Sequence, residues 1–183
     1  RVGRELLAAA GVLRIQGILN GTTNYILTRM ADGESYESAL REAQKKGYAE
    51  TNPSADVDGY DAAAKIVILS NLLLGIPLKM DNVEREGIGN LTTRDIVRAQ
   101  QVSEVWKLVA WVERTTDMVK ASVRPIRLPQ AHPLAGISGA TNAVTFVTKL
   151  LGEVTIVGPG AGRVETGYAI LSDLLDIHQR STL

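Results

Sequence analysis

Residues 119–124 have the sequence Val119-Lys120-Ala121-Ser122-Val123-Arg124, in which small or branched apolar residues alternate with polar ones. An alternation with a period of two indicates a β-strand with one buried face and one wet face. The apolar segment from Val105 to Glu113 is also typical of a strand. We expect the strand over 105–113 and a strand over 117–127 to form a hairpin whose turn is Arg114-Thr115-Thr116-Asp117. These two segments predict an antiparallel sheet.

Other strands are expected on either side of this hairpin. Val12 to Leu19 is rich in branched apolar residues and is predicted to be a buried strand. A second hairpin is predicted from Ala143 to Leu150 and from Val154 to Gly158, with its turn at Leu151-Gly152-Glu153. The expected strands therefore lie near 12–19, 105–113, 117–127, 143–150 and 153–158.

The remaining segments predict helices. Residues 1–10 indicate the end of a helix that Gly11 closes, and Thr22 or Thr23 is expected to cap a helix over 24–30. Ser35 is expected to cap the next helix, in which Tyr36, Ala39, Leu40 and Ala43 share a face and which Gly47 ends. Further helices are predicted over 58–74, 92–103 and 163–179. In the last one, a buried face is expected from Val164, Tyr168, Leu171 and Leu175.

This order of elements predicts the α+β (mixed α/β) class, with a largely antiparallel sheet of about five strands covered by helices. The helix over 58–74 is expected to pack on the sheet. Its second half, Ile66 to Leu74, is apolar nearly all round and is predicted to be buried. The length of 183 residues predicts one domain over 1–183.

Composition excludes several classes of function. Twenty basic and twenty acidic residues give a formal net charge of zero, so no electrostatic attraction to nucleic acid or to an anionic membrane is expected. The longest apolar run, Ile66 to Ile76, is too short for a membrane span and contains Ser70, Asn71 and Gly75. The absence of cysteine excludes disulfides and thiolate sites, and it fits a cytoplasmic protein.

The segment from Gly47 to Lys65 contains a cluster of charges. It holds the carboxylates Glu50, Asp56, Asp58 and Asp61 together with Lys65. If the helix starts at Asp58, then Asp58, Asp61 and Lys65 lie on one helical face. Charges carried into a buried helix are costly unless they are paired, and they often mark a functional site.

The charges in this segment have two other interpretations, a helix N-terminus and a calcium loop. Acidic residues favour a helix N-terminus, and an exposed Asp61–Lys65 pair would contribute less than about 1 kcal/mol; the local residues alone leave this interpretation open. A calcium loop is disfavoured by spacing, because counting from Asp56 puts Gly59 fourth rather than sixth and Val67 rather than a glutamate twelfth. No metal site is expected.

Several long segments are typical of one enzyme family. They are Gly17-Ile18-Leu19-Asn20-Gly21-Thr22-Thr23-Asn24-Tyr25-Ile26-Leu27; Ala43-Gln44 with Gly47-Tyr48-Ala49-Glu50; Asp56-Val57 with Gly59-Tyr60-Asp61-Ala62-Ala63-Ala64-Lys65; Asn90-Leu91-Thr92-Thr93-Arg94-Asp95-Ile96; and Gly158-Pro159-Gly160-Ala161-Gly162. In this order they resemble the motifs of homoserine dehydrogenases, and the resemblance covers essentially the whole chain. It implies interconversion of L-homoserine and L-aspartate 4-semialdehyde with NADP or NAD, in threonine and methionine biosynthesis.

The resemblance also implies roles for individual residues. Lys65 would donate the proton to the aldehyde oxygen, and Asp61 would bind substrate and hold Lys65. Glu50 would bind the substrate ammonium, and the residues that line the site with it would be Tyr48, Asp56 and Thr22. The cofactor contacts would come from Gly47, Gly160, Ala161 and Gly162. These roles agree with physical chemistry, because a charged lysine can stabilise an alkoxide-like oxygen and protonate it.

The family's members carry an N-terminal Rossmann domain, and no Gly-x-Gly-x-x-Gly strand-to-helix motif opens this chain. We therefore expect the nucleotide-binding domain to be absent from these residues and to be a partner of the chain, which would be inactive alone. The family resemblance also implies a homodimer formed through the sheet. An alternative is a standalone module, derived from this domain, that binds or oligomerises without catalysis.

Overall fold

A six-stranded sheet forms the centre of the computed structural model, which describes residues 2–75, 77–115 and 119–181. The strands run in the order β2-β4-β3-β1-β5-β6, and all neighbours pair antiparallel except β2 and β4, which are parallel. Their bounds are β1 (Val12–Ile18), β2 (Glu84–Arg85), β3 (Glu104–Arg114), β4 (Val119–Pro129), β5 (Thr141–Thr148) and β6 (Gly152–Pro159). The predicted class is confirmed. The sequence did not predict β2, because a strand of two residues is too short to display a period.

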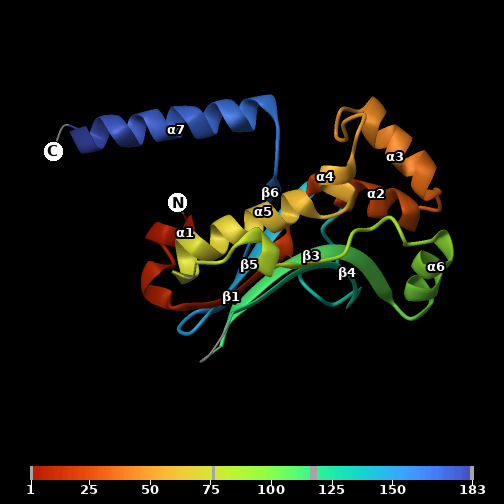
Figure 1. Ribbon diagram of the computed structural model, residues 1–183, viewed down its shortest axis with the longest axis horizontal. Coiled ribbons are helices and arrows are strands. Elements are labelled where there is room, and N and C mark those ends of the chain that lie inside the picture. The colour runs from red at the N-terminus through yellow and green to blue at the C-terminus, as the bar shows by residue number, and fades with distance from the viewer. Residues whose placement is uncertain (1, 76, 116–118, 182–183) are drawn as a thin grey trace.

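Most helices lie on one side of this sheet (Figure 1). The α-helices are α1 (Val2–Glu5), α2 (Gly21–Ala31), α3 (Tyr36–Lys45), α4 (Ser54–Val57), α5 (Tyr60–Leu69), α6 (Thr93–Gln101) and α7 (Arg163–Ser181). Shorter helical turns are η1 (Ala8–Ala10), the π-helical turn η2 (Ser70–Leu74) and η3 (Met80–Asn82). None of the helices described is long and apolar enough to cross a membrane.

The main core lies between the sheet and the helices. Ile15, Ala110 and Val123 come from three neighbouring strands and are fully buried, together with Ile26 of α2 and Ile66 of α5. Because side chains of a strand alternate between faces, the residues between them point to the other side of the sheet. There a second cluster buries Ile18 and Val109 beneath Leu134, which belongs to the segment between β4 and β5.

The junction between β1 and α2 differs from the prediction in its cap. Asn20, rather than Thr22 or Thr23, is the N-cap of α2, and its side-chain oxygen accepts a hydrogen bond from the Thr23 backbone N–H at 2.8 Å. The helix therefore begins three residues earlier than expected, at Gly21. A Cβ on Gly21 would lie 2.6 Å from the Ala140 carbonyl oxygen, so glycine allows the β4–β5 segment to approach.

The predicted helix over 58–74 forms, but it begins at Tyr60, and its last five residues, Ser70–Leu74, form a π-helical turn. Its residues are divided among the end of α4, α5 and η2, with Gly59 between α4 and α5 at a φ of 81°. The left-handed Gly59 separates this helix from α4, and the Val57 carbonyl at the end of α4 accepts a hydrogen bond from Ile88 N–H at 2.8 Å. Asp58 consequently ends α4 and does not share a helical face with Asp61 and Lys65. The second half is not buried all round either, because Ile68 and Leu72 are exposed.

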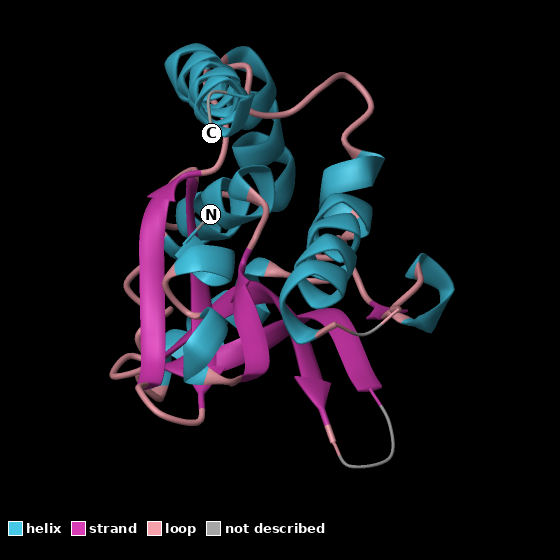
Figure 2. Ribbon diagram, turned by 90° about the vertical axis from the view of Figure 1, so that its left-hand side faces the viewer, coloured by secondary structure: helices cyan, strands magenta, loops and turns pink. Residues whose placement is uncertain are grey.

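The last helix forms where it was predicted, but its expected face is not buried. Val164, Tyr168, Leu171 and Leu175 are all exposed. Figure 1 shows the reason, because α7 leaves β6 and stands apart from the sheet and the other helices, and in Figure 2 the helix beside the label C lies above the strands. The periodicity identified the apolar side of α7 correctly without specifying what covers it.

The turns and caps agree with the sequence in most places. Ser35 caps α3 and Gly47 follows that helix with a φ of 76°, as predicted. Thr92, which was placed inside the predicted helix over 92–103, is instead the N-cap of α6 in a capping box. The second hairpin turns earlier than expected, because Thr148 pairs with Gly152. In the first hairpin, the predicted turn and the start of the strand over 117–127 include residues 116–118, which lie outside the described part of the chain.

Candidate active site

A cavity of about 560 Å³ lies at the end of β1 where α2 begins. Its walls are the β1–α2 junction, the segment from the end of α3 through α4 to α5, and two loops on either side of the β5–β6 hairpin. All ten residues singled out from the sequence line this cavity: Thr22, Gly47, Tyr48, Glu50, Asp56, Asp61, Lys65, Gly160, Ala161 and Gly162. Glu50, Asp61 and Lys65 therefore lie around one cavity, while their individual roles remain predictions.

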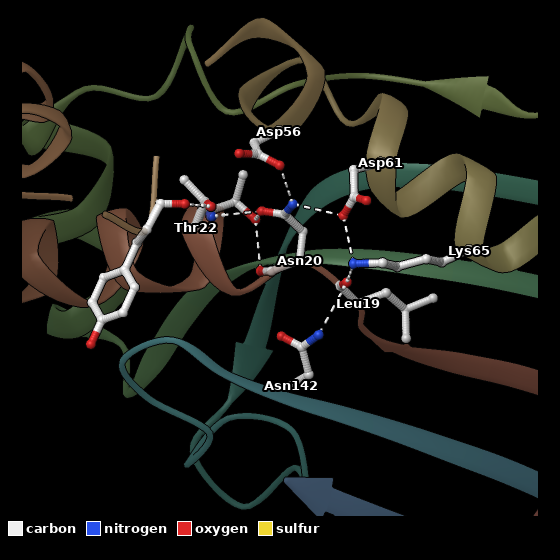
Figure 3. A network of polar contacts seen from close by, with 9 residues as sticks. Leu19, Asn20, Thr22, Asp56, Asp61, Lys65 and Asn142 are labelled. Atoms are coloured by element: carbon white, nitrogen blue, oxygen red, sulfur yellow. Dashed lines mark hydrogen bonds and ion pairs between the residues drawn. The ribbon is translucent and has the colours of Figure 1, made fainter. Parts of the chain in front are cut away.

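Lys65 is held by two acceptors (Figure 3). Its Nζ lies 2.7 Å from Oδ2 of Asp61, one helical turn earlier in α5, and 2.9 Å from the Leu19 carbonyl oxygen. The pair is partly exposed, so its contribution to stability is small, about 1 kcal/mol or less. The pair instead fixes the position of the Lys65 Nζ. An ammonium carries three N–H donors, and the two bonds leave one donor for a ligand in the cavity that Lys65 lines.

Asn20 connects the two carboxylates behind this lysine. Its Nδ2 donates to Oδ1 of Asp56 at 2.6 Å and to Oδ2 of Asp61 at 2.8 Å (Figure 3). Sequence reasoning interpreted Asn20 only as part of a turn. Its place directly after a buried strand was the available signal, but its partners lie 36 and 41 residues further along the chain.

Asn142 is a second residue that sequence reasoning missed. Its Nδ2 donates to the Leu19 carbonyl oxygen at 3.2 Å, so the same oxygen serves both Lys65 and Asn142. A Cβ on Gly160 would collide with the Asn142 amide. The glycine at 160 is therefore explained by the packing of the loop against Asn142, whether or not a ligand also approaches it. No local sequence signal distinguishes Asn142 from an ordinary strand residue.

Thr22 and Tyr48 form the side of the cavity next to α3. The Thr22 hydroxyl donates to the Tyr48 carbonyl oxygen at 2.6 Å, and the Tyr48 ring lies 5.0 Å from the Tyr25 ring, centroid to centroid. Because its single proton is used in this bond, the Thr22 oxygen can only accept from a ligand. Lys46 closes the rim, with Nζ 3.2 Å from Glu42 and over the Tyr25 ring.

Glu50 reaches the cavity from the extended segment between α3 and α4. Gln44 holds that segment, because its Nε2 donates to the Glu50 carbonyl oxygen at 3.1 Å. Glu50 lines the same cavity as the Asp61–Lys65 pair. In residues 2–75, 77–115 and 119–181, no group of three or more acidic or histidine side chains is placed to hold a metal ion.

Solved structures with the same fold define the class of protein. A homoserine dehydrogenase from Thiobacillus denitrificans superimposes with a TM-score of 0.95 at 36% identity, over 99% of this chain and 42% of that one. A putative homoserine dehydrogenase from Archaeoglobus fulgidus gives a TM-score of 0.90 at 42% identity, over 96% and 53% of the two chains. The fold is therefore one that solved homoserine dehydrogenases share.

The chain belongs to the homoserine dehydrogenase family, whose model matches residues 1–175. An NAD(+)-dependent homoserine dehydrogenase from Pseudomonas canavaninivorans is 46% identical over 183 residues, which is all of this chain and 52% of that protein. The homoserine dehydrogenase of Bacillus subtilis is 36% identical over 100% of this chain and 42% of its own length. The chain thus spans about half the length of such relatives.

Proposed function

We propose that this chain is the catalytic and substrate-binding part of an enzyme that interconverts L-homoserine and L-aspartate 4-semialdehyde with NAD(P)(H), in threonine and methionine biosynthesis. One observation carries the proposal: Lys65 is held by Asp61 and the Leu19 carbonyl in the cavity that Glu50 also lines. The relatives' names support it, since they are homoserine dehydrogenases.

Lys65 moves the proton in this proposal. Reduction of an aldehyde leaves an alkoxide-like oxygen, and the third N–H of the Lys65 ammonium is available to protonate it. In the direction of oxidation, a neutral Lys65 takes the hydroxyl proton of homoserine. Asp61 stabilises the charged form of the lysine and keeps its Nζ in place.

The amino-acid end of the substrate meets the acceptors of the cavity. Its ammonium carries three donors, and the Glu50 carboxylate and the Thr22 oxygen are acceptors on neighbouring parts of the wall. Tyr48 supplies the surface beside them, with its ring tilted by 58° against the ring of Tyr25. Asp56 adds negative charge to the opposite wall, where Asn20 holds it.

The residues present fit a nicotinamide cofactor at the mouth of the cavity. Gly47 has a positive φ and a Cβ built on it meets nothing within 4 Å, so its backbone is open to a ligand. Gly160, Ala161 and Gly162 line the same cavity without bulky side chains, directly ahead of α7. The bound cofactor would supply or accept the hydride. A hyperthermophilic archaeal relative, with a TM-score of 0.82 and 33% identity, was solved with NADPH.

We infer that a nucleotide-binding domain outside these residues makes most of the cofactor contacts, and that residues 1–183 are one catalytic domain. The length of the relatives supports this inference. The exposed apolar side chains of α7 support it as well, because they follow the Gly160-Ala161-Gly162 loop directly and offer a surface to such a domain.

We further propose a cytoplasmic homodimer that forms through the face of the sheet opposite the helices. A shallow cavity on that face is lined by Trp111, Val109, Ile126, Ser122, Arg124 and Gln16, a mixture of apolar and polar groups that suits an interface. Sedimentation analysis of the chain and of Trp111→Glu tests the proposal. A dimer that Trp111→Glu converts to a monomer supports it, whereas a monomer in both samples refutes it.

Calorimetric titration of the 183-residue chain with L-homoserine tests the proposed substrate. We expect saturable binding that Glu50→Ala weakens on the order of 10- to 150-fold, and no comparable binding of L-threonine, whose hydroxyl is on a different carbon. An absence of homoserine binding by the folded chain, with activity also absent once a nucleotide-binding domain is joined to it, would overturn the proposed function.

A further inference from the structure

We propose that Asn20 is a positioning residue for the reaction: it holds Asp61, and through Asp61 it holds Lys65, in the geometry that proton transfer requires. The inference rests on the proposed function. Asn20 is 4% exposed and does not need to touch the substrate to act in this way. Its influence travels through two consecutive contacts, Asn20 Nδ2 to Asp61 Oδ2 at 2.8 Å and Asp61 Oδ2 to Lys65 Nζ at 2.7 Å.

The orientation of the Asn20 amide is determined by neighbours that can only donate or only accept a hydrogen bond. A backbone N–H can only donate, so the Thr23 N–H at 2.8 Å requires the amide oxygen on that side. Ionised carboxylates can only accept, so Asp56 and Asp61 require the amide nitrogen on the other side. The two requirements come from different elements and agree, which leaves the amide no alternative flip.

Both hydrogens of the amide nitrogen are used, one on each carboxylate. Asp56 belongs to α4 and Asp61 to α5, and the break between these helices brings the two negative charges to the same donor. A cationic donor at this place would compete with Lys65 for Asp61. A neutral amide orients Asp61 Oδ2 without forming a second ion pair, so Lys65 is the cationic partner of Asp61.

The β1–α2 junction therefore holds both partners of the ion pair. The Leu19 carbonyl accepts from Lys65, and the next residue, Asn20, donates to Asp61 (Figure 3). Asn20 itself is fixed in an extended conformation as the cap of α2. Any shift of this junction moves the lysine and its carboxylate together.

Asn20→Asp separates positioning from capping. An aspartate keeps an oxygen that accepts from Thr23 N–H and remains a good N-cap, but its second oxygen cannot donate to Asp56 or Asp61. Asn20→Ser is the matched control, because it also caps the helix and adds no charge, while its single hydroxyl on a shorter side chain cannot replace the two amide hydrogens that serve Asp56 and Asp61. Both variants are assayed in the polypeptide that joins this chain to a nucleotide-binding domain, called the two-domain enzyme below.

We expect turnover to fall on the order of 10- to 100-fold in both variants, the range that a hydrogen bond to a charged group contributes. The KM for homoserine should change less than about threefold, because the substrate-binding groups on the Tyr48 side are untouched and the interaction acts on the transition state. Thermal unfolding of both variants is measured alongside, so that a loss of fold is recognised. Turnover of folded Asn20→Ser within twofold of the wild type would overturn the proposal.

A double variant distinguishes positioning of Asp61 from simple bridging of α4 to α2. In Asn20→Asp/Asp56→Asn, the new amide at 56 can donate to the new carboxylate at 20, so the bridge is restored. Asp61, however, still has a carboxylate at position 20 beside it and receives no hydrogen bond from there. We expect stability to recover while turnover stays low, whereas recovery of turnover would assign Asn20 a structural role only. If Lys65→Ala also leaves turnover unchanged, the proposed function fails; if Lys65 is essential and Asn20 is not, this inference alone fails.

Discussion

Lys65 Nζ lies 2.7 Å from Oδ2 of Asp61, one turn earlier on the same helix, and both side chains are partly exposed to the cavity. The exposure argues against a role for the pair in stability, because such pairs contribute about 1 kcal/mol or less. The second acceptor of Lys65, the Leu19 carbonyl, comes from the end of β1. A lysine held between a helix and a strand end is restrained in position while one of its hydrogens still faces the ligand space.

Replacement of Lys65 should affect chemistry more than binding. In the two-domain enzyme, Lys65→Ala should lower turnover by about 10²- to 10⁴-fold, the usual contribution of general acid–base catalysis, and change the homoserine KM far less. The reason is that proton transfer occurs only in the transition state. Steady-state kinetics in both directions measure the effect. Lys120→Ala, on the exposed side of β4, is the control, and a fall of only a few-fold for Lys65→Ala would contradict the assignment.

Replacement of Glu50 should have the opposite pattern. Its proposed partner, the substrate ammonium, is present in both ground and transition states, so Glu50→Ala should chiefly weaken homoserine binding. A hydrogen bond to a charged group contributes about 1.5–3 kcal/mol, which corresponds to roughly 10- to 150-fold in affinity. Calorimetry on the 183-residue chain measures it, with the exposed Glu37→Ala as control. Unchanged affinity in Glu50→Ala would remove Glu50 from the ammonium site.

The 183-residue chain alone should show no measurable dehydrogenase activity and should bind NAD or NADP only weakly. The four small residues at the cavity mouth offer backbone contacts, and the described part of the chain has no Rossmann unit for the rest of a dinucleotide. Fluorescence titration with NADPH and an assay with homoserine and NADP check this expectation. Turnover by the isolated chain would show that our assignment of the cofactor site to a second domain is wrong.

Lys107 should make stability depend on pH in the alkaline range. This β3 residue is 5% exposed, and its Nζ donates to Asn24 Oδ1 at 3.1 Å and to the Ile137 carbonyl oxygen at 2.5 Å. Both acceptors are neutral, and burial lowers the pKa of Lys107 to about 8 from its ordinary 10.5. Between these two values the unfolded state binds more protons than the folded state, so this group's contribution to stability increases as pH rises through that window.

Urea unfolding at several pH values from 7 to 10 measures this effect. The cost of burying the ammonium is fully present below pH 8 and decreases above it by up to about 1.4 kcal/mol per pH unit. Lys107→Met should remove this slope, while Lys120→Met, at an exposed position, should retain it. If the free energy of unfolding depends on pH equally in the wild type and in Lys107→Met, burial does not lower the pKa of Lys107 and the prediction is wrong.

The local pattern of the sequence was sufficient for most elements of the fold. The period of two in 119–124 identified β4, and Ser35 and Gly47 identified the two ends of α3, since strand alternation and helix capping act over a few residues. The i,i+4 spacing of Asp61 and Lys65 also predicted their pairing correctly, because both residues are on α5. The ten site residues that the family resemblance implied all line the cavity, whose wall also includes Asn20 and Asn142.

Three features were decided only by the tertiary structure. Residues 54–57, which were expected to lie in a loop, form the short helix α4 ahead of α5, and the Val57 carbonyl at its end is paired with Ile88 N–H, which is distant in sequence. Asn20 became the connection between Asp56 and Asp61 for the same reason, since its partners arrive on other elements. The apolar side of α7 was visible in the sequence, yet it is exposed. Periodicity reports which side of a helix is apolar, whereas burial depends on what other segments reach that side.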